Sequence, residues 1–211
     1  MLDLSLPPLD PAQGQRLERS AYKTTFWQDY ERIYEHDSWK LERRQHFEEQ
    51  GSASRAALRR GDWGEALRLL EDKRDALRRD AEQDRRQRTV FHRVRVVERP
   101  FTPYMQWELH SLRLNAEDGG EAIRVIDAAD VATLESKGRL PEVVVLGEQS
   151  LYEVIYTEAG VPDGGIRFSS PDLVEGWENL IKRLFDRGED IATYFAREVA
   201  PLPPPRITTQ E

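Results

Sequence analysis

The sequence predicts an α+β protein with a helical N-terminal half, followed by a small mixed or antiparallel sheet that helices cover. Three observations predict this class. Apolar residues recur at helical spacing in several segments of residues 20–88. Strand-like apolar runs alternate with helical segments in residues 89–199. A stripe that contains Leu173, Trp177 and Leu184 predicts a long C-terminal helix over the sheet.

Composition limits the function classes that the chain can serve. Of its 211 residues, 38% are hydrophobic and 33% are charged, so a core can form although charge exceeds the globular average. Cysteine is absent, which excludes disulfide frameworks, thiolate metal sites and cysteine nucleophiles. No stretch approaches the roughly 18 apolar residues of a membrane span, and the N-terminus lacks the basic and apolar regions of a secretory signal. We therefore expect a cytoplasmic protein with no membrane partner.

The domain boundaries are predicted from proline content. Residues 1–15 are expected to form a flexible lead-in, and the proline-rich residues 200–211 a tail with polyproline-like backbone. Residues 16–199 are expected to form a single α+β domain, helical up to residue 88 and sheet-containing beyond it.

Helices of the first half are predicted from spacing and capping residues. Phe26 and Tyr30 lie at helical spacing in the first of them. Ser52 and Asp62 are suited to begin two more, because their side-chain oxygens can accept from the free backbone N–H groups of a first turn. Residues 78–88 are charged on every face, which is typical of a solvated helix end or a linker.

Strands are predicted from alternation. Trp39 and Leu41 alternate with polar neighbours, so a short extended piece is expected there within the helical half. In the second half, residues 90–97 place Arg93 and Arg95 on one face and valines on the other. The predicted strands of this half are residues 90–97, 122–126, 142–147, 151–157 and 165–169.

Helices of the second half have clear start and stop signals. Thr102 followed by Pro103 predicts a helix that runs to about Asn115, because threonine caps and proline fits the first helical position. Ser170 similarly opens the long C-terminal helix, and Gly188 ends it.

The helix that begins at residue 103 gathers an acid, an imidazole and two aromatic rings, which is a composition suited to a ligand pocket. A helix packed on two sides also explains these aromatic residues without any ligand. The candidate ligand-binding residues, on this helix and the preceding strand, are Arg93, Arg95, Tyr104, Trp107, Glu108 and His110.

No common catalytic or metal-binding motif is present. The histidines are His36, His46, His92 and His110, and no two of them have the helical spacing of a zinc protease motif. Phosphate-binding glycine loops and nucleophile elbows are also absent. The sequence therefore predicts no catalytic residue, no metal ligand and no cofactor.

An arginine-rich segment, residues 78–99, suggests a second kind of partner. Arginine binds phosphate in a bidentate manner, so a nucleic-acid interface is one interpretation. The net charge of −8 and the absence of a helix-turn-helix motif favour a solvated, ion-paired helix face instead. Nucleic acid is accordingly not the expected partner.

Several motifs of the second half point to a known family. They are RVRVVERP at 93–100, TPY at 102–104, WE at 107–108, GEAIRVID at 120–127 and the hairpin at 151–168. Through these motifs the chain resembles the actinobacterial domain of unknown function family 6879 over residues 25–197. Genes of that family often lie beside genes for helix-turn-helix regulators, so the resemblance implies regulatory or conflict-related partners and no particular activity.

Residues 121–185 also resemble the C-terminal half of phospholipase-D-like sensor domains. The HxKxxxxD motif that those enzymes need is missing from this chain. This likeness therefore implies a catalytically inactive binding derivative.

Three hypotheses for function follow. The first is a non-catalytic regulatory or interaction protein that binds a small ligand or a helix-turn-helix regulator. The second is an enzyme of specialised metabolism with acid–base residues near Tyr104, Glu108 and His110. The third is a nucleic-acid binder that uses residues 78–99.

Overall fold

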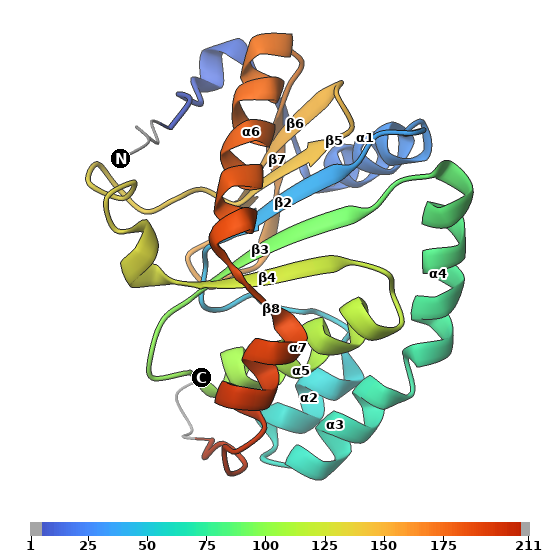
Figure 1. Cartoon of the computed structure of the whole chain (residues 1–211), viewed down its shortest axis with the longest axis vertical. Helices are drawn as coiled ribbons and strands as arrows, with labels where there is room; N and C mark the ends of the chain where they lie inside the picture. Colours follow the sequence, from blue (N-terminus) through green and yellow to red (C-terminus); the bar gives the residue numbers. More distant parts are fainter. Residues whose placement is uncertain (1–5, 208–211) are drawn as a thin grey trace.

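The computed structural model describes residues 6–207, which form one mixed sheet between two layers of helices (Figure 1). The helices are α1 (Arg19–Glu31), α2 (Ala53–Arg59), α3 (Trp63–Glu71), α4 (Arg74–Gln87), α5 (Pro103–Glu117), α6 (Pro171–Arg187) and α7 (Ile191–Tyr194), with short helical turns η1 (Pro11–Gln13), η2 (Ala128–Val131) and η3 (Phe195–Val199). The strands are β1 (Gln15–Leu17), β2 (Ser38–Glu42), β3 (Phe91–Val97), β4 (Ala122–Asp127), β5 (Val143–Leu146), β6 (Ser150–Tyr156), β7 (Pro162–Phe168) and β8 (Glu189–Asp190).

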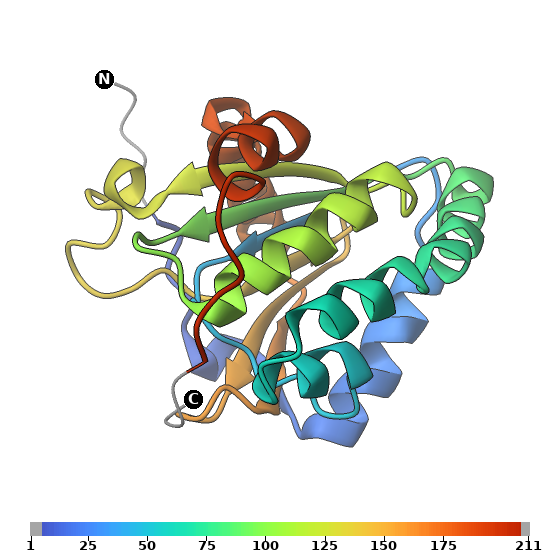
Figure 2. The same cartoon turned by 90° about the horizontal axis from the view of Figure 1, so that it is seen from below.

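The sheet has eight strands in the order β1-β7-β6-β5-β2-β3-β4-β8. Strands β2, β3 and β4 run parallel to one another, and the other neighbours are antiparallel. Parallel neighbours need long crossovers, which α2, α3 and α4 supply between β2 and β3, and α5 supplies between β3 and β4. Helix α6 covers one face, whereas α1 and α5 lie on the other (Figure 2).

The predicted division into a helical N-terminal half and a small sheet is wrong. Helices α5, α6 and α7 belong to the second half, and the sheet is large because the first half contributes β1 and β2. Strand β2 lies in the middle of the sheet, paired with both β3 and β5. Local alternation at Trp39 and Leu41 predicts an extended piece, but its two partner strands lie far away in the sequence, where no local pattern can reveal them.

Local signals for the elements are confirmed. The Thr102 hydroxyl accepts from the backbone N–H of Met105 at 3.0 Å, and Pro103 occupies the first turn of α5. The Asp62 carboxylate accepts from the backbone N–H of Glu65 at 3.1 Å and begins α3. Gly188 ends α6 as predicted.

The core beneath α6 contains the apolar side chains that face this helix from β2, β3, β5 and β6. Trp177 is only 1% exposed and lies in that core, as its place in the helical stripe predicts. Strand β5 is buried on both faces, which explains its uninterrupted VVVL sequence. Three further apolar clusters lie on the other face of the sheet, beneath α1, beneath α5, and between α5 and the pair α2 and α3.

The two ends of the chain pack against the fold where they are described. Residues 1–5 of the predicted lead-in and 208–211 of the predicted tail lie outside the described residues. Within the tail, the Gln106 side chain donates to the carbonyl of Pro203 at 3.0 Å, and Ile207 packs against the apolar cluster of α2, α3 and α5. No helix in residues 6–207 combines the length and the apolar character of a membrane span.

Candidate functional site

A band of charged side chains crosses the sheet on the face that carries α1 and α5. Strand alternation creates it, because every second residue of a strand points to the same face. Lys40 and Glu42 come from β2, and their parallel partners in the register, Arg93 and Arg95, come from β3. The other face of the same two strands is apolar and supports α6.

Arg95 holds the centre of this band and is completely buried. Its Nε and Nη2 atoms donate to Oε2 of Glu108 on α5, at 3.0 and 2.6 Å. The Tyr104 hydroxyl lies one helical turn earlier, 3.3 Å from Oε1 of Glu108 and 3.1 Å from Oε1 of Glu49. Three of the predicted site residues, Arg95, Tyr104 and Glu108, therefore form one buried network.

Arg93 continues the band toward the surface. Its Nη1 donates to Oε1 of Glu42 at 2.9 Å, and its Nε donates to Oε2 of Glu121 at 2.9 Å. The ammonium group of Lys40 lies 2.6 Å from the same Glu42 oxygen. Glu42 thus joins the predicted residue Arg93 to the network around Arg95.

The carboxyl groups of the network compete for these cations. Burial tends to raise the pKa of Glu42, but the charges of Arg93, Lys40 and Arg95 outweigh burial and lower it. Burial raises the pKa of Glu108 to about 7, and the neighbouring carboxylates of Glu42 and Glu49 oppose the lowering effect of Arg95. Glu108 is therefore the carboxyl group that takes up a proton near neutral pH.

The remaining two predicted site residues lie elsewhere. The indole N–H of Trp107 donates to the Ser54 hydroxyl at 2.8 Å inside the cluster formed with α2 and α3.

The ring of His110 packs edge-on against Trp63 and Phe195, at centroid distances of 5.2 and 4.7 Å. Burial lowers the pKa of His110 to about 4, so this imidazole is neutral at physiological pH. The structure does not bring His110 to the Glu108 network.

An open cavity of about 310 Å³ begins where the charged band reaches the surface. Helices α1 and α4 form its walls, the first half of β3 forms its floor, and the loop between α5 and β4 closes one side. Arg93 and Glu121 belong both to this cavity and to the band. The lining residues are Phe26, Trp27, Tyr30, Leu77, Asp80, Gln83, Asp84, Phe91, Arg93, Gly119 and Glu121.

Arg93 is the one lining residue that the sequence marks as a candidate ligand-binding residue. The aromatic residues of α1 are visible in the sequence, but they have the helical spacing of an ordinary core stripe. Their partner α4 lies far along the chain, and the Tyr30 hydroxyl donates to Oδ1 of Asp84 at 2.5 Å across that separation. No motif marks such a pair in advance.

The arginines of residues 78–99 are engaged mainly with nearby carboxylates. Most of these acidic partners lie before residue 128 rather than in the acidic C-terminal part of the chain. The ion pairs in the described part of this segment include Arg78 with Asp75 and Asp118, Arg86 with Glu82, Arg88 with Glu35, Arg93 with Glu42 and Glu121, Arg95 with Glu108, and Arg99 with Asp127 and Glu198.

Within residues 6–207, no three His, Asp or Glu side chains come together as a metal site would require.

Comparison with known proteins places the chain in a family. The family model described as "Domain of unknown function (DUF6879)" matches residues 25–196. The chain belongs to this family. The matched residues begin in α1 and end in η3, so they include the charged band, the cavity and α6. Neither the curated proteins nor the solved structures include a match to the chain.

Proposed function

We propose that this family member is a non-catalytic regulatory or interaction protein that binds a small ligand in the cavity between α1, α4 and β3. One observation carries the proposal. The cavity is open, its volume of about 310 Å³ suits a small molecule, and aromatic and charged side chains from four separate segments line it.

The arrangement of ionisable residues supports a binding role over catalysis. A general acid and a general base can act together only if both reach the same bound substrate. Glu108 faces Arg95, whereas His110, two residues later on α5, contacts Trp63 and Phe195. Residues two apart on a helix point about 200° apart, so this pair does not converge on one substrate.

The test is ligand-dependent stabilisation, measured as the rise in melting temperature with a panel of small cationic, neutral and anionic metabolites. A ligand that binds only the folded state raises the melting temperature, and the rise increases with ligand concentration relative to the dissociation constant. Gln83→Trp places a large side chain in the cavity and should abolish the rise.

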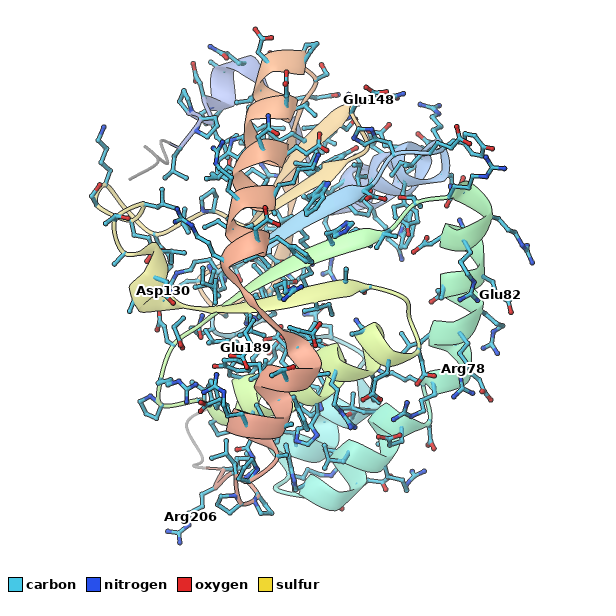
Figure 3. All side chains as sticks on the ribbon, viewed as in Figure 1. Arg78, Glu82, Asp130, Glu148, Glu189 and Arg206 are labelled. Atoms are coloured by element: carbon cyan, nitrogen blue, oxygen red, sulfur yellow. The ribbon has the colours of Figure 1, made fainter. Side chains whose placement is uncertain are left out.

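A matched control uses the neighbouring residue of α4. Glu82 points outward from α4 (Figure 3), so Glu82→Trp should keep the rise in melting temperature. The proposal would be contradicted if no ligand of the panel raised the melting temperature of the unaltered protein more than it raised that of Gln83→Trp.

A further inference from the structure

The walls of the cavity between α1, α4 and β3 are aromatic. The ring of Trp27 meets that of Tyr30 edge-on at a centroid distance of 5.5 Å, and Phe26 stacks on Tyr30 at 6.5 Å. Phe91 supplies a further ring from the floor. Trp27 keeps 50% of its surface exposed, although an indole gains considerably from burial. Aromatic faces of this kind attract organic cations through the ring quadrupole.

The charged side chains that line the cavity also favour a cation, because most of them are acidic. Three carboxylates, Asp80, Asp84 and Glu121, line it against one guanidinium, that of Arg93. Arg93 is already neutralised, because it donates to both Glu42 and Glu121. An anionic ligand would therefore meet uncompensated negative charge and no free cation of this cavity.

Asp84 is the carboxylate best placed to meet a ligand. Its Oδ1 accepts from the Tyr30 hydroxyl at 2.5 Å, which fixes the carboxyl group beside the aromatic wall. Burial raises the pKa of Asp84, and the nearby charges of Glu121 and Asp80 raise it further. A ligand cation would relieve this repulsion, so charge and aromatic surface favour the same chemistry.

We infer that the ligand is a small organic cation, with an ammonium or methylated ammonium group held between the α1 aromatic rings and the Asp84 carboxylate. This inference rests on the proposed function and names the ligand class of the same cavity. It excludes phosphorylated metabolites and other anions as ligands of this site.

Three probes of similar size test the charge. Choline carries a trimethylammonium group, its carbon isostere carries a neutral tert-butyl group in the same place, and tert-butylacetate carries a negative charge. Calorimetric titration at millimolar concentration should show binding of choline that is on the order of tenfold tighter than binding of the neutral isostere. The anion should not bind.

Variants assign the binding to the cavity. Asp84→Asn and Trp27→Ala should each weaken choline binding by on the order of tenfold. Asp75→Asn makes the same charge change at a surface position of α4, and Tyr34→Ala removes another exposed aromatic ring, so both should bind choline normally. Because Trp27 is half exposed, Trp27→Ala should stay folded even if Asp84→Asn does not.

The results distinguish the claim that the cavity binds a small ligand from the claim that this ligand is a cation. Equal binding of choline and its neutral isostere, or no choline binding at all, overturns the cation inference. If a neutral or anionic ligand binds and Gln83→Trp abolishes that binding, the cavity remains a ligand site and only the ligand class is wrong. If Gln83→Trp changes the binding of no ligand, the proposed function fails as well.

Discussion

Arg95 and Glu108 join the centre of the sheet to α5 through a buried ion pair. Two guanidinium nitrogens of Arg95 reach the same carboxylate oxygen, at 3.0 and 2.6 Å. The third, Nη1, donates to the backbone carbonyls of Glu42 and Val96 at 3.2 Å. The guanidinium is thus satisfied within the protein, which assigns it a role in fixing α5 on the sheet.

Removing one partner of this pair should destabilise the fold strongly. Arg95→Met leaves the buried Glu108 carboxyl group without its partner, and removing one partner of a buried pair costs about 3–5 kcal/mol. Arg95→Met combined with Glu108→Leu should cost less than the sum of the two single changes, because no buried polar group is left without its partner. Urea unfolding of the three variants measures this, and strictly additive losses would contradict the coupling.

Glu108 should also make stability depend on pH. The pKa of Glu108 is about 7 in the folded protein and about 4.3 in an unfolded chain. The folded state therefore holds the proton more tightly, so this contribution to stability is complete below about pH 4.3 and is lost as the pH rises through about 7. As the pH rises from about 4.3 to about 7, the free energy of unfolding should therefore decrease relative to that of Glu108→Gln.

Other titrating groups also change stability with pH, so the prediction concerns the difference in free energy of unfolding between the unaltered protein and Glu108→Gln at each pH. Glu42 has a lowered pKa, so its contribution disappears as the pH falls, but it is present in both proteins and largely cancels. Urea unfolding across this pH range gives the difference. A difference that stays constant with pH would show that the pKa of Glu108 is the same in the folded and unfolded states.

The sequence predicts the elements of this protein better than their arrangement. Capping by Asp62 and Thr102 and the termination of α6 at Gly188 depend on neighbours in the sequence, and all three are confirmed. The place of β2 depends on two distant strands, so local alternation could not predict the large sheet. The two-residue strand β8 is likewise defined only by its partner β4.

Some residues of the candidate site can likewise be predicted from the sequence, whereas others are brought together only by the fold. The sequence predicts both Arg95 and Glu108 as site residues, and the structure pairs them because one lies on β3 and the other on the face of α5 above it. The sequence does not indicate Glu42, although it links Arg93 to this network. The cavity could not be predicted, because it exists only where α1 and α4 come together.

Trp177 is expected to anchor α6. It is 1% exposed and lies in the core beneath this helix, so Trp177→Ala should cost about 3–5 kcal/mol through lost burial and the cavity left behind. Trp27→Ala is the matched control, since Trp27 is 50% exposed and its loss should cost about 1 kcal/mol or less. Thermal unfolding compares the two, and equal effects would show that α6 does not dock through Trp177.

The arginine-rich segment is expected not to bind nucleic acid. Arg88 pairs with Glu35, and Arg86 lies 3.8 Å from Glu82, so part of the positive charge is compensated within the protein. We expect no measurable binding of duplex DNA or RNA at physiological salt. A tight complex that weakens steeply with salt, and that is lost when Arg85, Arg86 and Arg88 are replaced by Glu, would establish the opposite.

The hydrogen bond from Tyr30 to Asp84 should set the pH dependence of cation binding. A cation binds the ionised carboxylate, so choline affinity should fall as the pH drops through the pKa of Asp84. Burial and neighbouring carboxylates raise this pKa, whereas the Tyr30 hydroxyl lowers it. Tyr30→Phe removes the lowering contribution, and the midpoint of the affinity profile should move to higher pH.

Calorimetric titration of choline over a pH series measures the midpoint, and NMR of the Asp84 side-chain carboxyl gives the pKa directly. Tyr34→Phe removes a hydroxyl from an exposed tyrosine that does not line the cavity, so it should leave the profile unchanged. If Tyr30→Phe kept the original midpoint while choline still bound, a carboxylate other than Asp84 would hold the cation. Glu121, the other half-buried carboxylate of the cavity, would then be the group to replace by Gln.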